Sequence, residues 1–305
     1  MKQKLLIRLL FSMSSVSVLM WGNSGSFVYN LRLAEATKQY ITLDNFHIYA
    51  GGITAVGQYR ETFDGNQQHT EGALLTFLSE RQSWYMRVDG ALARDEQITD
   101  ISRASRTQLD DILITGGYCH THHDDVKMTL SGLFGIPTHR NRGLTEPQFG
   151  IGHVAVGGQF DASWTYADEE GNKQALWGAA RFIHFFPRTV LLPVNPPCLS
   201  PFDFSLGNLV DLFFAHNSLW GRHSFEFGYN PTFLFHSKTD PFLEIIAQEV
   251  PFIRSSFYLS YHCRFLKGRH LSKLVVGFSY GADHRPQTVG YRHIMTGWFG
   301  WNFIF

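Results

Sequence analysis

The chain has 305 residues with 26 basic and 26 acidic side chains, so its formal net charge at pH 7 is zero and no general attraction to nucleic acid is expected. Charged residues make up 17% and aromatic residues 15% of the sequence, whereas about a quarter of a typical soluble chain is charged. Beyond the N-terminal region no uninterrupted apolar run approaches the roughly 20 residues of a transmembrane helix, which excludes a helical membrane protein.

The first 26 residues have the pattern of a secretory signal peptide. A basic start and a short apolar stretch, residues 9–21, precede small residues at the expected cleavage site ahead of Phe27; the basic and small residues are Lys2, Lys4, Arg8, Ser24 and Ser26. The alternative is a single membrane anchor, for which the apolar stretch is short. Residues 27–44 are ambiguous, either a short helix or a lead-in segment.

Residues 45–305 are expected to form one all-β domain of about twelve antiparallel strands. Alternating runs follow one another and are separated by turn residues. The expected strands are 45–60, 72–80, 84–95, 109–120, 125–135, 149–166, 172–187, 206–217, 222–236, 251–263, 270–282 and 290–305.

The connections between these strands fall into two sets. After every even-numbered strand the link is short, as in "ERQS" and "SLWGRH", and after most odd-numbered strands it is longer, as in residues 187–206. Short turns at one end and longer loops at the other are typical of outer-membrane barrels, whose short turns face the periplasm. An even number of strands also leaves both chain ends on the short-turn side.

One face of most expected strands is aromatic and the other is polar. In "SFEFGYNPTFLFH", Phe225 and Phe227 share a face, and Glu226 and Asn230 lie on the opposite one. In a soluble protein the aromatic face would be the core, whereas in a membrane barrel it meets lipid and the polar face lines the lumen. Aromatic residues at a common level favour the membrane; those near the short turns are Trp84, Trp164, Trp220, Trp301, Tyr118 and Tyr261.

The last residues, "MTGWFGWNFIF" at 295–305, place Phe299, Trp301, Phe303 and Phe305 on one strand face, with Gly297 a weaker match. This ending resembles the C-terminal recognition strand of Gram-negative outer-membrane β-barrel proteins, which ends in an aromatic residue preceded by alternating apolar residues. The resemblance implies a closed antiparallel transmembrane β-barrel in the outer membrane, reached through the periplasm with the signal peptide. It also implies two partners, the lipid bilayer and the barrel-insertion machinery that reads the last strand.

The expected inward face is mixed in charge and suits a narrow, passive, porin-like channel for small polar or charged solutes. Arg254, Arg264 and Arg292, with Lys273 on the strand between, are expected to form a basic stripe on one wall. The alternative is a salt-bridge network that braces or closes the barrel. The residues expected to line the channel are Arg87, Asp89, Lys127, His153, Asp161, Glu226, Arg254, His262, Arg264, Lys273, Asp283 and Arg292.

The alternative function is an outer-membrane hydrolase. His216 and Ser218 resemble the His-x-Ser of the outer-membrane phospholipase, in which the histidine activates a serine nucleophile, but no third member is evident. Asp110 and Asp111 invite comparison with the omptin proteases, yet adjacent strand residues point to opposite faces and cannot form one dyad. No catalytic residue is therefore assigned.

A non-conducting structural or adhesive barrel is the third possibility, with residues 187–206 either folded into the lumen or contacting another protein. The turn "HTHHDD" contains His120, His122 and His123, whose side chains suit zinc or another borderline cation. The same residues fit an ordinary polar turn, so neither a metal site nor a cofactor is expected.

Overall fold

The computed structural model describes most of the expected barrel and one short segment ahead of it. The described residues are 26–29, 47–63, 65–81, 83–99, 102–122, 125–138, 151–167, 169, 173–195, 198–204, 206–235, 253–267, 270–284 and 291–304. The expected signal peptide, apart from Ser26, lies outside these ranges, as does most of the 27–44 segment. No helix within the described ranges is long and apolar enough to cross a membrane.

The described residues form fifteen antiparallel strands; twelve correspond to the expected ones, whereas β4, β9 and β10 lie in stretches expected to be connections. Their bounds are β1 His47–Thr62, β2 Gln67–Arg81, β3 Trp84–Thr99, β4 Ser102–Leu109, β5 Ile112–His122, β6 Val126–Ile136, β7 Ala155–Ala167, β8 Lys173–Phe185, β9 Arg188–Asn195, β10 Cys198–Phe204, β11 Gly207–Trp220, β12 His223–Phe235, β13 Ile253–Lys267, β14 His270–Asp283 and β15 Tyr291–Ile304.

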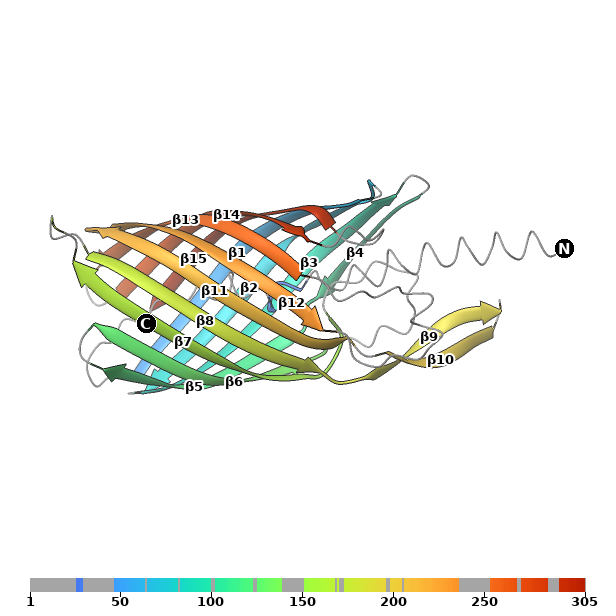
Figure 1. Cartoon of the computed structure of the whole chain (residues 1–305), viewed down its shortest axis with the longest axis horizontal. Helices are drawn as coiled ribbons and strands as arrows, with labels where there is room; N and C mark the ends of the chain where they lie inside the picture. Colours follow the sequence, from blue (N-terminus) through green and yellow to red (C-terminus); the bar gives the residue numbers. More distant parts are fainter. Residues whose placement is uncertain are drawn as a thin grey trace.

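Twelve of these strands close into a barrel, because β1 pairs with both β2 and the last strand, β15. The strands run at an angle to the long axis of the barrel, and the hairpin of β9 and β10 projects beyond one end (Figure 1). That hairpin occupies most of the predicted 187–206 loop, so this part of the loop extends away from the lumen. Strand β4 extends the wall along the edge of β3 beyond β5, end to end with it. The predicted closed antiparallel barrel is therefore confirmed.

The wall is apolar outside and polar inside. Phe227 and Phe278 are 56% and 50% exposed, whereas Glu226 and Lys273, on the opposite faces of their strands, are 5% exposed. The large aromatic residues near the short turns are exposed too, among them Trp84, Trp164, Trp220 and Trp301. Burying ionic groups while exposing phenylalanine is the reverse of a soluble protein and matches a wall surrounded by lipid.

On part of the wall the inward side chains change character along the barrel axis. We call the ends of the barrel the short-turn end and the long-loop end, after their connections. From the long-loop end, four strands carry a polar, then a largely apolar, then a polar inward residue, with buried serines between them on β13 and β14: Asp95, Ala91 and Arg87 on β3; Asp211, Phe213 and Asn217 on β11; Arg254, Tyr258 and His262 on β13; Asp283, Val275 and Lys273 on β14. We refer to these as the upper polar layer, the apolar layer and the lower polar layer.

Candidate functional site

The lumen is the candidate functional site, and most of the residues expected to line it do point inward. Lys127, Arg254 and Arg264 are half-buried. The fully buried ones are Arg87, Asp89, His153, Asp161, Glu226, His262, Lys273 and Asp283. His153 lies just before β7 rather than in the predicted 149–166 strand, and its Nδ1 is 2.7 Å from the carbonyl oxygen of Phe186.

Arg292 does not line the lumen. Its side chain is exposed, and the preceding Tyr291 is the buried residue. The pairing between β1 and β15 shifts here, because Glu61 lies opposite His293 whereas Thr62 lies opposite Tyr291. Arg292 is thus the extra residue of a β-bulge, which reverses the alternation of side chains. The prediction for Arg292 was wrong because a bulge leaves no clear mark in the sequence.

Buried ion pairs fill part of the upper polar layer. The Nε atom of Arg254 is 2.8 Å from Oδ1 of Asp283, and the other carboxylate oxygen accepts the backbone N–H of Tyr291 at 3.0 Å. On β8 and β11, beyond β12 in the wall, Arg181 and Asp211 form a second pair at 2.5 Å, and Asp211 also accepts the hydroxyl of Thr232 at 2.7 Å. Each pair joins two adjacent strands.

The remaining groups of this layer form a hydrogen-bonded chain. Arg60 donates to the side-chain oxygen of Gln68 at 3.3 Å, and the amide nitrogen of Gln68 donates to Asp95 at 2.9 Å. Asp95 also accepts the hydroxyl of Thr70 at 2.7 Å. The guanidinium of Arg60 lies over the ring of Tyr291, 5.4 Å from its centre, which adds a cation–π contact.

The lower polar layer brings cations together instead. Arg264 and Lys273 lie directly opposite each other in the pairing of β13 with β14. Arg254, at the other end of β13, is paired with Asp283. The predicted basic stripe is therefore not continuous: it is reduced to two adjacent cations near the short-turn end.

The two acids of the lower polar layer have different kinds of partner. Glu226 accepts the Tyr258 hydroxyl at 2.8 Å and the Asn217 amide at 3.2 Å, and it interacts electrostatically with Lys273. On β3, Asp89 accepts a hydrogen bond from Nε of Arg87 at 2.7 Å. This layer is thus a set of polar clusters rather than one closed network.

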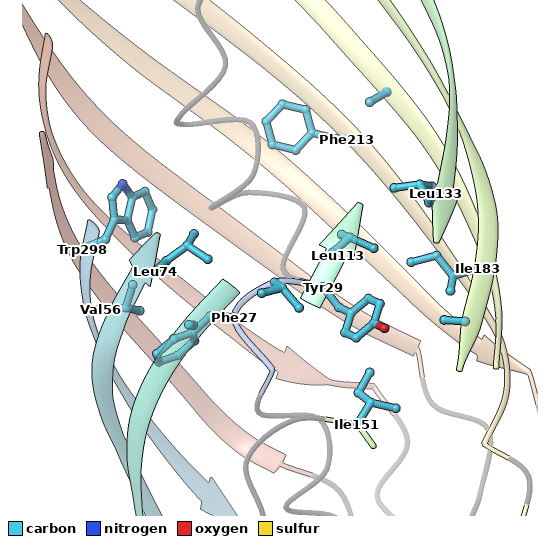
Figure 2. Close-up of a cluster of buried hydrophobic side chains, with 14 of the residues drawn as sticks. Phe27, Tyr29, Val56, Leu74, Leu113, Leu133, Ile151, Ile183, Phe213 and Trp298 are labelled. Carbon is cyan, nitrogen blue, oxygen red and sulfur yellow. The ribbon is translucent and has the colours of Figure 1, made fainter. Parts of the chain in front are cut away.

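The apolar layer contains a segment that is not part of the wall. Phe27 and Val28 are each 1% exposed, and Phe27 and Tyr29 point among wall residues from several strands (Figure 2). The ring of Tyr29 meets that of Phe185 edge-on at 5.5 Å, and Arg181 donates to the Tyr29 carbonyl oxygen. We call residues 26–29 the N-terminal segment. It lies inside the barrel and extends from Phe27, among buried apolar residues, to Tyr29, which packs at the long-loop ends of β6 and β8.

Asp110 and Asp111 hold this segment and a neighbouring loop. The strand predicted at 109–120 is interrupted at these two residues, and both side chains are buried. Asp110 accepts the Ser26 hydroxyl and the Phe27 N–H, both at 2.7 Å, and the Val28 N–H at 3.1 Å. Asp111 accepts the N–H groups of residues 151 and 152 at 2.9 and 3.0 Å. The prediction that the two must point to opposite faces was wrong, because it assumed a continuous strand.

Burial dominates the titration of groups in these connections. It raises the pKa of both Asp110 and Asp111, and the neighbouring Asp110 charge raises that of Asp111 further. Burial, followed by the charge of Arg188, lowers the pKa of His153 to about 3, so its imidazole is neutral at physiological pH.

The suggested catalytic pair has no catalytic arrangement. His216 and Ser218 belong to the outward-facing set of β11, next to the short-turn end. The Ser218 hydroxyl donates to Gln174 at 2.6 Å, and the Nε2 atom of His216 is 3.4 Å from the Tyr166 hydroxyl. Each group is therefore engaged with a different neighbour.

The suggested metal ligands are only partly within the described residues. His120 is exposed near the end of β5, whereas His123 and the side chain of His122 lie outside the described parts. No group of three histidine, cysteine, aspartate or glutamate side chains able to hold a metal ion occurs in the described ranges.

Several buried charged residues were not among those expected to line the lumen. Asp95 follows the same alternation as Arg87 and Asp89, so the sequence pattern points to it. Arg181 has no such signal, because the first half of β8 does not alternate cleanly. The N-terminal segment gives none either: nothing in these four residues indicates that they enter a barrel formed far along the chain.

The structure is similar to solved outer-membrane barrels. An outer-membrane channel from Pseudomonas putida F1 matches with a TM-score of 0.64 and 11% identity, over 88% of this chain and 100% of that chain. The translocator domain of the autotransporter NalP from Neisseria meningitidis matches with a TM-score of 0.51 and 10% identity, over 89% and 93%. No family model and no curated protein matches the sequence. At these identities the likeness concerns the fold, and in its fold the chain is a Gram-negative outer-membrane β-barrel.

Proposed function

We propose that the protein is a narrow passive channel of the outer membrane for small polar or charged solutes, and that it prefers anions. The observation that carries the proposal is the pair of adjacent cations, Arg264 and Lys273, inside the lumen near the short-turn end. Cationic groups within a confined, low-dielectric passage raise the local concentration of anions. The similar outer-membrane channel supports a conducting barrel as a class.

The described conformation corresponds to a closed channel in this proposal. The apolar layer separates two polar layers, and a narrow apolar constriction excludes water and therefore ions. Phe27 is packed among the apolar residues inside the barrel, and Tyr29 fills the lumen nearer the long-loop end; neither belongs to the wall. Conduction would then require the N-terminal segment to move, which is easier than moving a strand held by two neighbours.

An outer-membrane location and insertion through the last strand belong to the same proposal. Phe299, Trp301 and Phe303 are 52%, 54% and 37% exposed on β15, where the insertion machinery can read them; Phe305 lies outside the described residues. Cell fractionation and a detergent gel with heated and unheated samples test this. We expect outer-membrane recovery and a faster-migrating unheated band, and both are expected to be lost in W301D/F303D.

Conductance in planar bilayers tests the channel. We expect small, infrequent steps for the purified wild type and larger, frequent ones for Phe27→Gly with Tyr29→Gly. Reversal potentials in a salt gradient should show anion preference, which falls at least about threefold in R264Q/K273Q. Arg103→Gln, which changes an exposed arginine on β4, is the matched control and should leave selectivity unchanged.

Two outcomes would contradict the proposal. A barrel that conducts in neither form is a structural or adhesive one. A barrel that conducts with unchanged selectivity in R264Q/K273Q is a channel whose preference is set elsewhere. A hydrolase is not proposed, because the described contacts of His216 and Ser218 give no nucleophile and base pair.

A further inference from the structure

The carboxylate of Asp110 is surrounded by the N-terminal segment. Its hydrogen-bond donors within the described chain are the Ser26 hydroxyl and the N–H groups of Phe27, Val28 and Asp111, at 2.7, 2.7, 3.1 and 2.8 Å. All four donors are neutral, and Asp110 is 1% exposed. A buried carboxylate is costly unless a positive charge accompanies it, and the second carboxylate of Asp111 increases that cost.

The predicted signal-peptide cleavage site and the hydrogen bonds of Asp110 both involve the backbone nitrogen of Phe27. The pattern places cleavage between Ser26 and Phe27, and the nitrogen that this cleavage would release is the one 2.7 Å from Oδ2 of Asp110. The two observations are independent, because the first uses only residues 1–27 and the second depends on a strand break some 80 residues later.

We propose that Asp110 is the binding site for the amino terminus of the mature protein, and that the α-ammonium group of Phe27 pairs with its carboxylate inside the barrel. Signal peptidase hydrolyses the Ser26–Phe27 bond: water gives its hydroxyl to the Ser26 carbonyl carbon and a proton to the Phe27 nitrogen, which takes up a further proton from solvent. The ammonium group then offers three donors, and at its ordinary pKa of about 7.7–8.0 it is charged at neutral pH.

This ion pair would hold the N-terminal segment in place inside the lumen. Phe27 and Val28 are packed in the apolar layer, and the Tyr29 carbonyl oxygen is bound by Arg181, itself paired with Asp211. The N-terminal segment is therefore held at its start by Asp110, between β4 and β5, and at its end by Arg181 on β8. The Tyr29 side chain fits because residue 135 on β6 is glycine; a Cβ there would overlap its hydroxyl.

The first experiment identifies the terminus and measures its protection. The protein is expressed with its own leader, purified from outer membranes, and characterised by N-terminal sequencing and intact mass. We expect Phe27 as the first residue. Its α-amine in the folded barrel should react with an amine-directed reagent at neutral pH at least about tenfold more slowly than in the heat-unfolded chain, because it is buried and ion-paired.

Asp110→Asn is the informative variant and Asp111→Asn the matched control. The two substitutions have the same size and lie side by side, but among the described hydrogen bonds only those of Asp110 reach the N-terminal segment. We expect most of the protection to be lost in Asp110→Asn and retained in Asp111→Asn, with both proteins still showing the shifted band of a folded barrel. Equal protection in the two variants would overturn the proposal, and so would a first residue other than Phe27.

A chain with an extended amino terminus tests the pairing without changing Asp110. A chain refolded with one glycine ahead of Phe27 carries the same charge but displaces it by up to about 3.6 Å. We expect it to lose protection and to unfold at a lower denaturant concentration than the chain beginning at Phe27; identical behaviour would refute the pairing. The proposal rests on the predicted cleavage and not on conduction, so a non-conducting barrel with a protected Phe27 contradicts only the channel.

Discussion

The two polar layers of the lumen differ in how their charges are balanced. In the upper polar layer, Arg254 and Arg181 are each paired with an aspartate on a neighbouring strand. In the lower polar layer, Arg264 and Lys273 lie side by side, and Glu226 is bound by a tyrosine hydroxyl and an amide. The upper layer pairs each of these arginines with a carboxylate on the neighbouring strand, whereas the lower one places two cations next to each other. Under the proposed function, the first arrangement braces the barrel and the second selects solutes.

The largest effect is expected from breaking an upper pair. Asp211→Ala leaves the buried guanidinium of Arg181 without its carboxylate, which typically costs about 3–5 kcal/mol. Urea unfolding of the refolded barrel, followed by tryptophan fluorescence, measures it. The double variant R181L/D211L, which buries no charge, should recover most of the loss; if it is no more stable than Asp211→Ala, the pair is not what braces this level.

Acidification should weaken the long-loop end through His153. Burial lowers the pKa of this group to about 3, below the ordinary value of about 6.5. The unfolded chain therefore takes up a proton at His153 as the pH falls below about 6.5, and the folded chain does not until about pH 3. The contribution of neutral His153 to the free energy of unfolding is therefore fully present above about pH 6.5. It decreases as the pH falls towards 3, by at most about 1.4 kcal/mol per pH unit.

Unfolding midpoints between pH 7 and pH 4 test this effect. His153→Asn should show a smaller loss than the wild type over the same range. His223→Asn, an exposed residue of β12, should behave as the wild type does. An identical slope in all three proteins would show that other groups control the acid response.

A lower-layer substitution should cost less stability and change selectivity more. Glu226→Gln keeps one acceptor for the Tyr258 hydroxyl but loses the charge, and the expected cost is about 1–2 kcal/mol. Removing this negative charge beside Lys273 should also increase anion preference in reversal-potential measurements. A loss as large as that of Asp211→Ala, with unchanged selectivity, would mean that both layers only brace the barrel.

The smallest effect is expected outside the lumen. Arg103 and Glu96 form an ion pair at 2.6 Å on β4 and β3, but the arginine is exposed. Pairs of this kind contribute little, because water and salt screen them. Arg103→Ala should leave both the unfolding midpoint and the conductance unchanged; a clear loss would make the β4 extension part of the stabilising structure.

The fold was predictable because each strand of a membrane barrel has a sequence pattern that can be recognised within the strand itself. Each strand must alternate, each short turn must be polar, and the last strand must carry Phe299, Trp301 and Phe303 on one face. The prediction missed β4, β9 and β10, which lie outside the closed ring of twelve strands, and it missed the interruption at Asp110. The bulge at Arg292 is the same kind of error: one extra residue reverses every assignment beyond it.

The sequence by itself determined which side of the wall faces lipid and which faces the lumen, because a period of two residues follows from strand geometry alone. Only the tertiary structure decided how the inward groups combine. Arg181 meets Asp211, and Asp110 meets Phe27, across distances of 30 and 83 residues in the chain. Such contacts depend on the closure and register of the barrel, which no local pattern specifies. The sequence is therefore enough to assign the outer and inner faces of the wall, whereas the contacts among the inward groups follow from the closed barrel.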